Sequence, residues 1–388
     1  MALVCPYCYE SFQEKEILFR CTGRTSRFGK VCARKVDEVL LSRTGRRDAV
    51  PPFFGGDGRQ TTASCPHCQD ESTYRICPAC HSQLPLHFGK VRSRMIALIG
   101  ARESGKTVFM TVLVHELTNR VGARFNAAVV GCDDTTRSRF SEDYEKHLYE
   151  ERRLLGATRS AATLAGGLVS PLVFRFTTQQ NGLFGRPRTV RSLFSFFDTA
   201  GEDLRTQQSV DLNVRYLNSA DGIILLLDPL QMAGARQLAS DSARLPLAAE
   251  SPLNVLSRVT ELLQARQGTP SSRIQKPTAV AFSKLDALWH GFAPGSPLQR
   301  LPEDIPGFDR RDSLDVHDHV RALLHDWGGG QIDQVLQHYY ARYRYFAVSA
   351  LGQSPTQDNR VTTIQPYRVA DPFLWLLAEF GVIPAARS

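Results

Sequence analysis

The sequence contains no long apolar run, and this absence excludes a membrane-spanning helix. Its longest apolar stretches are short, such as Gly222–Leu227, whereas a membrane span requires ~18 apolar residues. The first residues, Met1-Ala-Leu-Val-Cys5-Pro, lack the basic segment and apolar stretch of a secretory signal. Internal repeats are also absent, and 42% hydrophobic with 22% charged residues excludes a disordered, coiled-coil or collagen-like chain. We therefore expect a soluble, cytoplasmic protein without a membrane partner.

The 388 residues are enough for two or three domains, and the composition changes near residue 90. Residues 1–90 are rich in cysteine and predict a small zinc-binding module, with a Pro-, Gly- and Arg-rich loop at residues 43–62. Residues 91–388 alternate apolar runs with helical periodicity, which predicts an α/β fold with a mostly parallel sheet and helices on both faces. Strands are expected at residues 95–99, 173–177, 193–197, 223–227, 279–282 and 345–348, and helices at 108–120, 137–155, 253–265, 315–325, 332–343 and 371–380.

Eight of the nine cysteines lie in the N-terminal module. Cys65-Pro-His-Cys68 and Cys77-Pro-Ala-Cys80 are two tight turns, each of which can present a pair of thiolates to one tetrahedral zinc ion. A third turn, Cys5-Pro-Tyr-Cys8, then takes Cys21 and Cys32 as its partners. The spacing therefore predicts two zinc sites of four cysteines each, although it leaves open whether ligands are exchanged between them.

Two other uses of these cysteines are disfavoured. A thioredoxin-like redox pair needs a long helix after the second cysteine, but Asp70-Glu-Ser-Thr73 and a further cysteine pair follow Cys68 too closely. Structural disulfides require an oxidising compartment, against which the missing secretory signal argues. Cys132 stands alone in the sequence, and we interpret it as a small buried hydrophobic residue.

The basic charge of the module bears on its partner. Lys and Arg number 47 against 39 Asp and Glu, and six of the eight excess positive charges lie in residues 1–94, a pattern typical of nucleic-acid binders. Two zinc ions bound by eight thiolates lower the net charge of this segment to +2. No interleaving of aromatic and basic residues is evident either. The sequence therefore favours a protein partner, with nucleic acid as the alternative.

Gly100-Ala-Arg-Glu-Ser-Gly105-Lys106-Thr107 matches the pattern G-x-x-x-x-G-K-[ST] of a phosphate-binding loop. Its glycines allow backbone N–H groups to surround phosphates at the start of a helix, and the loop lies between an expected strand and an expected helix. Lys106 would reach the β- and γ-phosphates, and Thr107 would ligate Mg²⁺. We assign to the nucleotide site Gly100, Glu103, Ser104, Gly105, Lys106, Thr107 and Val108.

A second motif, Asp198-Thr-Ala-Gly201-Glu202, ends the strand expected at residues 193–197. Asp198 can hold Mg²⁺ through a water molecule, and the Gly201 N–H can bond the γ-phosphate. Loss of that bond on hydrolysis would release the segment that follows, which converts a nucleotide state into a conformational one.

Two further motifs suit a guanine base. In Ser283-Lys284-Leu285-Asp286, Asp286 can accept hydrogen bonds from the ring N–H and the exocyclic amine of guanine, while the Lys284 stem packs on the base. Adenine lacks this pair of donors, so an ATPase is disfavoured. After the last expected strand, the Ala350 N–H can meet guanine O6. We assign to the base site Ser283, Lys284, Asp286, Ser349, Ala350 and Leu351.

These four motifs in this order resemble those of a Ras-like GTPase domain, which would cover residues 94–388. The whole chain, a cysteine-rich ribbon followed by this domain and by Val369-Ala-Asp-Pro-Phe-Leu-Trp-Leu-Leu377, resembles the bacterial double-GTPase proteins, which are predicted to act in conflict or defence-type systems. The resemblance implies a P-loop switch protein that binds GTP and GDP with Mg²⁺ and hydrolyses GTP. Because the corrected charge of the module favours a protein partner, we expect the zinc module to dock a regulatory or effector protein.

The sequence departs from the Ras-like pattern in three respects. Glu202 stands where many such proteins have a glutamine that orients the attacking water, and a carboxylate cannot donate to the γ-phosphate oxygen. We therefore expect slow hydrolysis that an arginine supplied in trans can accelerate. Ser283 replaces Asn or Thr but keeps a hydroxyl group. Long insertions are expected near residues 131–168 and 290–330.

The first insertion should contain the threonine that senses the γ-phosphate. Thr158 and Thr163 are the candidates, and Thr158 is preferred because it follows the helix end expected at Gly156. Thr135 and Thr136 are interpreted as a helix cap.

The second insertion places His317, His319 and His325 near one expected helix. Nothing nearby completes a metal site, and we interpret these side chains as facing solvent.

Two alternatives to the switch remain open. In one, the zinc module grips DNA or RNA and the nucleotide controls release; in the other, indicated only by Glu202, the chain is a pseudo-GTPase scaffold that does not hydrolyse GTP. A zinc ribbon by itself implies no particular ligand. Strong salt dependence of polynucleotide binding would favour the first alternative.

Overall fold

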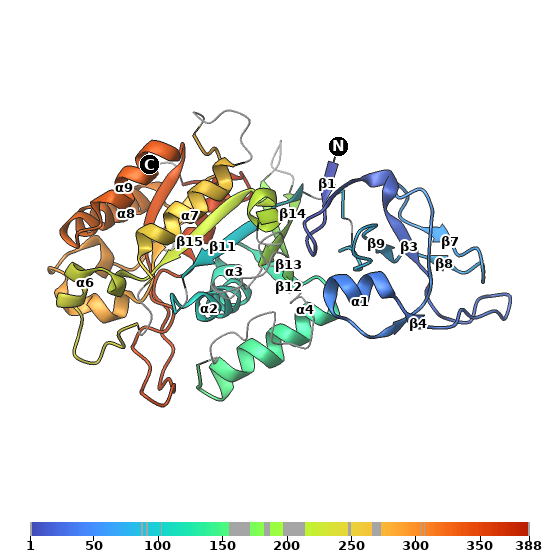
Figure 1. Cartoon of the computed structure of the whole chain (residues 1–388), viewed down its shortest axis with the longest axis horizontal. Coiled ribbons are helices and arrows are strands. Elements are labelled where there is room, and N and C mark those ends of the chain that lie inside the picture. Colours follow the sequence, from blue (N-terminus) through green and yellow to red (C-terminus); the bar gives the residue numbers. More distant parts are fainter. Residues whose placement is uncertain are drawn as a thin grey trace.

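The computed structural model describes residues 2–86, 88–90, 92–101, 103–154, 171–181, 187–196, 214–246, 250–265, 273–303, 305 and 307–386. Within these residues, the cysteine-rich N-terminal part forms a small β-rich module on the right of Figure 1, beside a larger α/β domain. No helix among the described residues is both long and apolar enough to cross a membrane.

Four apolar strands form the centre of the α/β domain: β11 (Ile96–Gly100), β15 (Gly222–Leu227), β16 (Thr278–Phe282) and β17 (Tyr343–Ala347). They pair in parallel in the order β11-β15-β16-β17. All residues of β15 and β16 are buried, because helices cover both faces of the sheet. The predicted α/β class with a mostly parallel sheet is confirmed.

A second sheet continues the first. β10 (Arg92–Ser93) pairs in parallel with β14 (Pro187–Phe196), and β13 (Leu172–Asn181) pairs antiparallel with both β14 and β12 (Ala127–Gly131). Only two residues separate β10 from β11, and the Arg94 N–H donates to the Leu193 carbonyl over 2.9 Å. The strand order is therefore β12-β13-β14-β10/β11-β15-β16-β17, in which β13 alone, among the strands described here, runs against the others.

The alternation of side chains along β15 separates two hydrophobic cores. Ile224 and Leu226 enter one core, whereas Ile223 and Leu225 enter the other, as the period of two along a strand requires. The first core is covered by α2 (Lys106–Thr118) and α10 (Asp371–Glu379), and the second by α7 (Pro252–Gln264), α8 (Arg310–Asp326) and α9 (Gly330–Tyr339).

Three expected helices differ from those observed, and the one expected at residues 315–325 begins five residues earlier, as α8. The helix expected at residues 137–155 begins earlier, as α4 (Asp134–Arg139), and continues as a π-helix, η2 (Phe140–Glu150). The helix expected at residues 332–343 ends at Tyr339, because the chain turns into β17 at Tyr343. Short helices of the domain include α3 (Arg120–Arg124), α6 (Ala233–Gln237), η5 (Pro229–Gln231), η6 (Leu285–Gly291) and η7 (Pro297–Gln299). Residues 214–219 are helical as well.

Strands of two or three residues build the N-terminal module. β3 (Leu18–Arg20) lies between β6 (Phe53–Phe54) and β9 (Arg75–Ile76) and is antiparallel to both. The stretch expected as a loop, residues 43–62, thus contains β6 as well as β5 (Ala49–Val50). The remaining elements are β1 (Ala2–Val4) paired with β2 (Ser11–Gln13), β4 (Lys35–Val36) paired with β5, β7 (Ala63–Ser64) paired with β8 (Glu71–Ser72), α1 (Glu38–Thr44) and η1 (Glu14–Glu16).

The N-terminal module covers one face of β14. Phe194 and Phe196 point into the core beneath α10, whereas Leu193 packs among the cysteines of the module. Ser195 points the same way as Leu193, and its hydroxyl donates to the Pro6 carbonyl over 2.8 Å. The module therefore takes the place of a helical layer over this part of the sheet.

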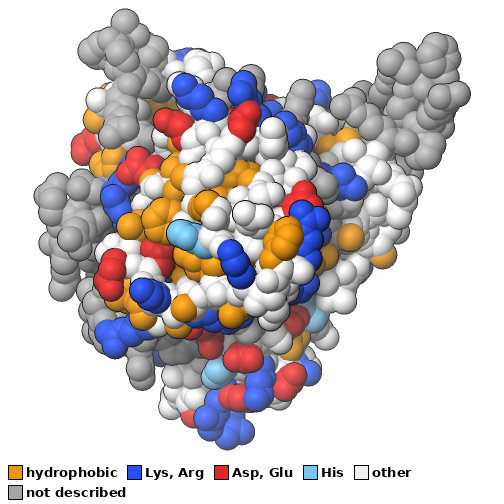
Figure 2. All heavy atoms as spheres, turned by 90° about the vertical axis from the view of Figure 1, so that its right-hand side faces the viewer, with side chains coloured by type: hydrophobic (Ala, Val, Ile, Leu, Met, Phe, Trp, Pro, Cys, Tyr) orange, Lys and Arg blue, Asp and Glu red, His pale blue; other side chains and the backbone are white. Residues whose placement is uncertain are grey.

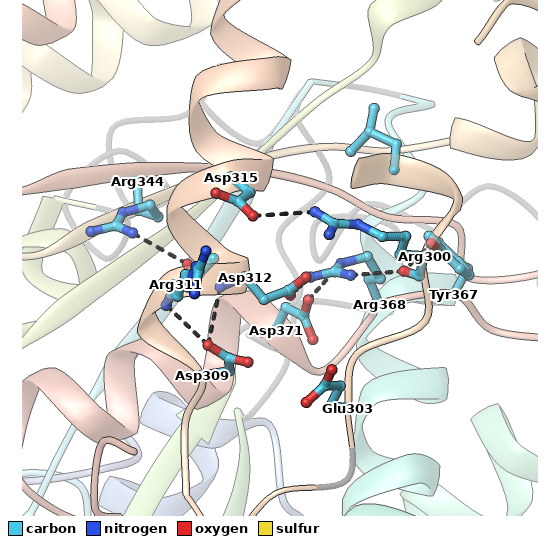
Figure 3. Close-up of polar contacts among 12 residues, drawn as sticks. Arg300, Glu303, Asp309, Arg311, Asp312, Asp315, Arg344, Tyr367, Arg368 and Asp371 are labelled. Atoms are coloured by element: carbon cyan, nitrogen blue, oxygen red, sulfur yellow. Dashed lines mark hydrogen bonds and ion pairs between the residues drawn. The ribbon is translucent and has the colours of Figure 1, made fainter. Parts of the chain in front are cut away.

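A buried arginine ties the second insertion to the C-terminal helix (Figure 3). The Arg368 side chain is only 1% exposed; it bonds to Asp312 of α8, lies 2.8 Å from an Asp371 oxygen of α10, and donates to the Arg300 carbonyl over 3.0 Å. The Tyr367 hydroxyl donates to the same carbonyl over 2.6 Å. Two carboxylates thus share one guanidinium group at the base of the insertion.

Replacing Arg368 with methionine should lower the free energy of unfolding by about 3 kcal/mol. The change removes a buried guanidinium group and leaves the partly buried carboxylates of Asp312 and Asp371 without their partner. Arg311 on the same helix as Asp312 has an exposed side chain, and its alanine variant should stay within about 0.5 kcal/mol of the wild type. Denaturant titrations of both variants measure this difference. Equal stabilities would mean that the cluster does not anchor the insertion.

Candidate functional site

The predicted nucleotide motifs meet at one edge of the central sheet. β11 ends at Gly100, Ser283 directly follows β16, and Ser349 follows β17 after one residue. Because these strands are parallel, their carboxyl ends lie at the same edge. The phosphate loop and both parts of the base site are therefore brought together by the fold.

The phosphate loop has the backbone that its glycines allow. A Cβ on Gly100 would lie 2.6 Å from both the Leu226 carbonyl oxygen and Ser104 Oγ, so no larger residue fits there. Gly105 has φ +83° and directly precedes α2, a conformation that favours glycine. Lys106 is buried, and its ammonium group donates to the Gly100 carbonyl over 2.9 Å.

At the predicted base site, the two strand ends bring together a pair of side chains. The Ser349 hydroxyl donates to Asp286 Oδ1 over 2.5 Å and accepts the Gly352 N–H over 2.8 Å. The Leu285 N–H donates to the Val348 carbonyl over 3.1 Å. One Asp286 oxygen is thereby fixed. The side chain remains half-buried rather than enclosed.

Asp228, at the end of β15, belongs to this edge but was missed in the sequence. Its carboxylate is 2% exposed and accepts the Lys284 ammonium over 2.6 Å and the Leu230 N–H over 2.9 Å. Lys284 itself has the left-handed backbone angle φ 56°. Asp228 thus holds the lysine whose stem was predicted to lie on the base. Its position directly after the apolar run 222–227 could have indicated Asp228 as a residue of this edge.

Burial raises the pKa of the Asp286 carboxyl, and the hydrogen bond from Ser349 only partly offsets this effect. Guanine N–H donors require the ionised carboxylate, so a bound base lowers the pKa again. GDP affinity should therefore be complete above the raised pKa and should fall as the pH drops through it. Titrations with GDP at pH values from 7 down to the ordinary carboxyl pKa of 3.8 measure this loss, and the slope that remains in Asp286→Ala reports the phosphates alone. Equal slopes would contradict the role of Asp286.

Four predicted site residues, Thr158, Asp198, Gly201 and Glu202, lie outside the described residues, as does the alternative Thr163. Among the others, Ala350 and Leu351 follow β17 at the same edge as Asp286. The Leu351 carbonyl accepts the Gln365 N–H over 2.9 Å.

The predicted helix cap and the histidines differ in detail from the expectation. The cap of α4 is Asp133, whose carboxylate accepts the Thr136 N–H over 2.7 Å, so the threonines lie in the first turn instead. His317 does not face solvent freely: it accepts the Tyr345 N–H over 3.0 Å, and burial lowers its pKa to about 4. His319 is half-buried and lies 2.9 Å from Ser296 Oγ.

Three cysteine turns of the module share one backbone geometry. The residue after the second cysteine is Tyr9, Gln69 or His81, with φ between 56° and 61°. Its N–H donates to the carbonyl of the first cysteine over 2.8–3.0 Å. In two of these turns a further N–H, from Tyr7 or Ala79, points at the first sulfur over 3.4 Å. Such turns aim two sulfur atoms at a common point, as a metal ion requires.

The pairing of these turns corrects the expected one. Cys65–Cys68 and Cys77–Cys80 were expected to share a site, and so were Cys5, Cys8, Cys21 and Cys32. The structure instead forms a first cluster of Cys5, Cys8, Cys77 and Cys80, and a second cluster of Cys21, Cys32, Cys65 and Cys68. The antiparallel pairing of β3 and β9 explains this result: Cys21 and Cys77 directly follow these strands and so lie at opposite ends of the pair.

Both clusters fit a zinc ion. The sulfur atoms Cys5–Cys80, Cys8–Cys77, Cys21–Cys68 and Cys32–Cys65 are 3.6–3.9 Å apart, and a tetrahedral site with Zn–S bonds of ~2.3 Å requires about 3.8 Å. All eight cysteines are free thiols rather than disulfides. Cys132 packs against the first cluster without joining it. Burial raises its pKa to about 12.

The module also presents a mixed surface (Figure 2). Phe28, Val31, Val36, Phe53 and Leu86 are 44–63% exposed, and Figure 2 shows hydrophobic side chains across the middle of this side of the molecule, with Lys and Arg around them. The Arg27 guanidinium lies 4.9 Å from the centre of the Phe28 ring. The expectation that aromatic and basic residues do not interleave in the module is therefore wrong at this loop.

The fold and this edge define a P-loop protein of the GTPase type. Residues 94–322, more than half of the chain, match the model of the family Double-GTPase 2, and the chain belongs to that family. It is accordingly a GTP-binding switch protein in its fold and family. Guanine nucleotide is its expected ligand, usually together with Mg²⁺.

Individual proteins that resemble this chain share only 12–28% of its residues in the aligned regions. The putative ESX-1 scaffolding and assembly protein SaeC of Mycolicibacterium smegmatis is 28% identical over 410 aligned positions, which cover 98% of this chain and 99% of that protein. The small GTPase Arl6/BBS3 of Trypanosoma brucei is 12% identical, with a TM-score of 0.27, over 75% of this chain and 99% of its own. The GTPase-like domain of S. cerevisiae Ski7 is 13% identical, with a TM-score of 0.32, over 75% of this chain and 50% of its own.

Proposed function

We propose that this protein is a nucleotide-dependent switch that hydrolyses GTP slowly and docks a partner protein through its zinc module. The observation that carries the proposal is the Asp286–Ser349 pair. It holds a carboxylate at the edge of the sheet where β11 ends and the phosphate loop begins. A carboxylate there selects guanine over adenine because guanine has a pair of hydrogen-bond donors and adenine does not.

The phosphate end of the nucleotide would lie on the backbone of the loop that follows β11. Lys106 would exchange its bond to the Gly100 carbonyl for the β- and γ-phosphates. Mg²⁺, when bound, neutralises phosphate charge, and Thr107 and Asp198 would hold it. Gly201 would bond the γ-phosphate.

Slow hydrolysis follows from the charge of Glu202. A carboxylate beside the attacking water opposes the negative charge that develops on the phosphate, and it has no proton to donate. An arginine from a second protein would offset this charge, which is worth ~10³-fold or more in related chemistry.

The mixed surface of the module suits an acidic protein partner with apolar side chains. Residues 17–36 contain six Lys or Arg and no Asp or Glu, and all six except Arg20 are exposed. An acidic partner would therefore meet uncompensated positive charge around Phe28 and Val31. The name of the relative SaeC, a putative scaffolding and assembly protein, supports a role in bringing partners together. A place in a bacterial conflict system remains part of this proposal.

Nucleic acid is the second candidate partner, because Arg27 and Phe28 form the kind of basic and aromatic pair on which an unpaired base can stack. Binding of a labelled acidic peptide with alternating Glu and Phe residues, and of single-stranded RNA of equal charge, separates the two candidates. The peptide should bind and Arg27→Glu/Lys30→Glu should abolish this, whereas Lys146→Glu/Arg311→Glu should not. Tighter RNA binding with a steep salt dependence would favour the alternative.

The switch itself is tested by the nucleotide that co-purifies with the protein and by GTP turnover. We expect GDP or GTP rather than adenine nucleotides, and turnover far below that of an activated GTPase. Rapid turnover by the isolated protein would remove the slow-hydrolysis proposal, and equal binding of adenine nucleotides would remove the guanine switch.

A further inference from the structure

The first cysteine cluster is attached directly to the α/β domain, because the residue after Cys8 enters the core of that domain. Tyr9 is 2% exposed and belongs to the same hydrophobic core as Ala97 of β11 and Ile223 of β15. Its left-handed backbone would suit glycine better. A large aromatic residue at this position is therefore explained by its side chain, which the turn inserts into the neighbouring domain.

Tyr9 packs on a second tyrosine that reaches the strand of the phosphate loop. The rings of Tyr9 and Tyr216 are 5.1 Å apart. The Tyr216 hydroxyl accepts the Leu98 N–H over 2.9 Å and donates to the Ile96 carbonyl over 3.0 Å. It thus occupies one N–H and one carbonyl of β11, two and four residues before Gly100. The Tyr216 side chain therefore lies between the Tyr9 ring and the strand that leads into the phosphate loop.

The same turn also holds both ends of the segment that contains the Asp198–Gly201 motif. On the N-terminal side, the Tyr9 hydroxyl lies 3.2 Å from Ser195 Oγ. On the C-terminal side, Arg215 forms an ion pair with Glu10, and the Ser219 hydroxyl donates to the Tyr9 carbonyl over 3.3 Å. The residues between these anchors are those that respond to the γ-phosphate in the proposed switch.

We propose that zinc at the first cluster and nucleotide at the phosphate loop are energetically coupled through Tyr9 and Tyr216. Each then changes the affinity of the protein for the other, since coupling between two sites is reciprocal. This inference rests on the proposed nucleotide switch. It makes Tyr9 and Tyr216 positioning residues, which contact neither the metal nor the nucleotide.

The second cluster provides an internal control. Its cysteines pack with Phe19, Phe54 and Ala63, and no described residue of the α/β domain belongs to that group. Zinc release from the second cluster should therefore be indifferent to the bound nucleotide, although both clusters have four cysteine ligands and similar sulfur spacings.

The test measures zinc release to a chromogenic chelator from the full-length protein loaded with GDP or with a non-hydrolysable GTP analogue. Two zinc equivalents should be released. The release rate of the zinc ion from the first cluster should differ by about fivefold or more between the two nucleotides, the scale of a typical coupling. The release rate of the zinc ion from the second cluster should not differ. A variant lacking the second site, Cys21→Ser/Cys32→Ser, assigns the nucleotide-dependent phase to the first cluster.

Tyr216→Phe keeps the ring and removes the hydroxyl group that bonds to Ile96 and Leu98. This variant should still bind both nucleotides and two zinc ions. Its rate of zinc release from the first cluster should be the same with GDP as with the GTP analogue, within about twofold, which is below the scale of a typical coupling. Tyr74→Phe, a conservative change elsewhere in the module, should keep the wild-type difference. If the wild-type protein binds each nucleotide but releases zinc at the same rate with GDP as with the GTP analogue, the coupling is refuted and the proposed switch is not. If neither nucleotide binds, the proposed function and the coupling fail together.

Discussion

Replacing Asp286 with alanine is expected to lower the affinity for GDP by about 100-fold or more. The variant loses two hydrogen bonds to a charged group, each worth ~1.5–3 kcal/mol, and ~1.4 kcal/mol corresponds to a factor of ten. Ser349 also loses the carboxylate to which its hydroxyl donates. Affinity for ATP should change little, because adenine offers no donor pair to this carboxylate. Titrations with fluorescent GDP and ATP measure both effects.

A conservative variant separates recognition from folding. In Asp286→Asn the amide can donate, which suits a base that carries a carbonyl group in place of the exocyclic amine of guanine. This variant should lose GDP but bind xanthosine diphosphate, and Asp358→Ala, which removes an exposed carboxylate, should bind GDP normally. A folded Asp286→Ala protein with less than about threefold loss of GDP affinity, under ~1 kcal/mol, would show that the base is read elsewhere.

The zinc content of double cysteine variants is expected to follow the nested pairing of the clusters. Cys5→Ser/Cys80→Ser removes two ligands from one cluster and should leave about one zinc ion per chain. Cys65→Ser/Cys80→Ser removes one ligand from each cluster and should leave almost none. The difference is large because loss of a structural zinc ion sacrifices ~10–16 kcal/mol of binding free energy. Metal analysis of the purified variants measures it.

The pairing expected from the sequence, in which neighbouring cysteine turns share a site, predicts the opposite result. It places Cys65 and Cys80 in one site, so their double variant would keep one zinc ion, and Cys5→Ser/Cys80→Ser would keep none. A retained zinc ion in Cys65→Ser/Cys80→Ser would therefore contradict the structure. Circular dichroism of both variants shows whether the α/β domain stays folded, so that metal loss is not mistaken for unfolding.

Much of the α/β domain could be predicted because its signals are local. The run Gly222–Leu227 is apolar throughout and is buried on both faces as β15, and the loop from Gly100 to Thr107 carries its own strand-to-helix context. The common edge of Gly100, Ser283 and Ser349 then follows from parallel pairing. These conclusions need only short stretches of sequence and one rule about strand direction.

The features that could not be predicted depend on contacts between distant residues. Spacing alone favoured Cys65–Cys68 with Cys77–Cys80, because nothing local shows that β3 pairs with β9 in opposite directions. Tyr9 gave no signal either, since a tyrosine in a cysteine turn is ordinary until β14 and Tyr216 lie against it. Asp228 had a local signal, namely its position after an apolar strand, but no motif drew attention to it.

The two clusters are nested along the chain, and this has a consequence during synthesis. Cys21 to Cys68 lie within the span from Cys5 to Cys80, so the inner metal site can close before the outer one is complete. Leu193 and Ser195, on which the outer site packs, are made more than a hundred residues later than Cys80. At about 5–20 residues per second, the ribosome needs about 6–23 s to reach them. During that interval Tyr9 has no domain to enter, and the nascent module must carry this apolar side chain in water or on a chaperone.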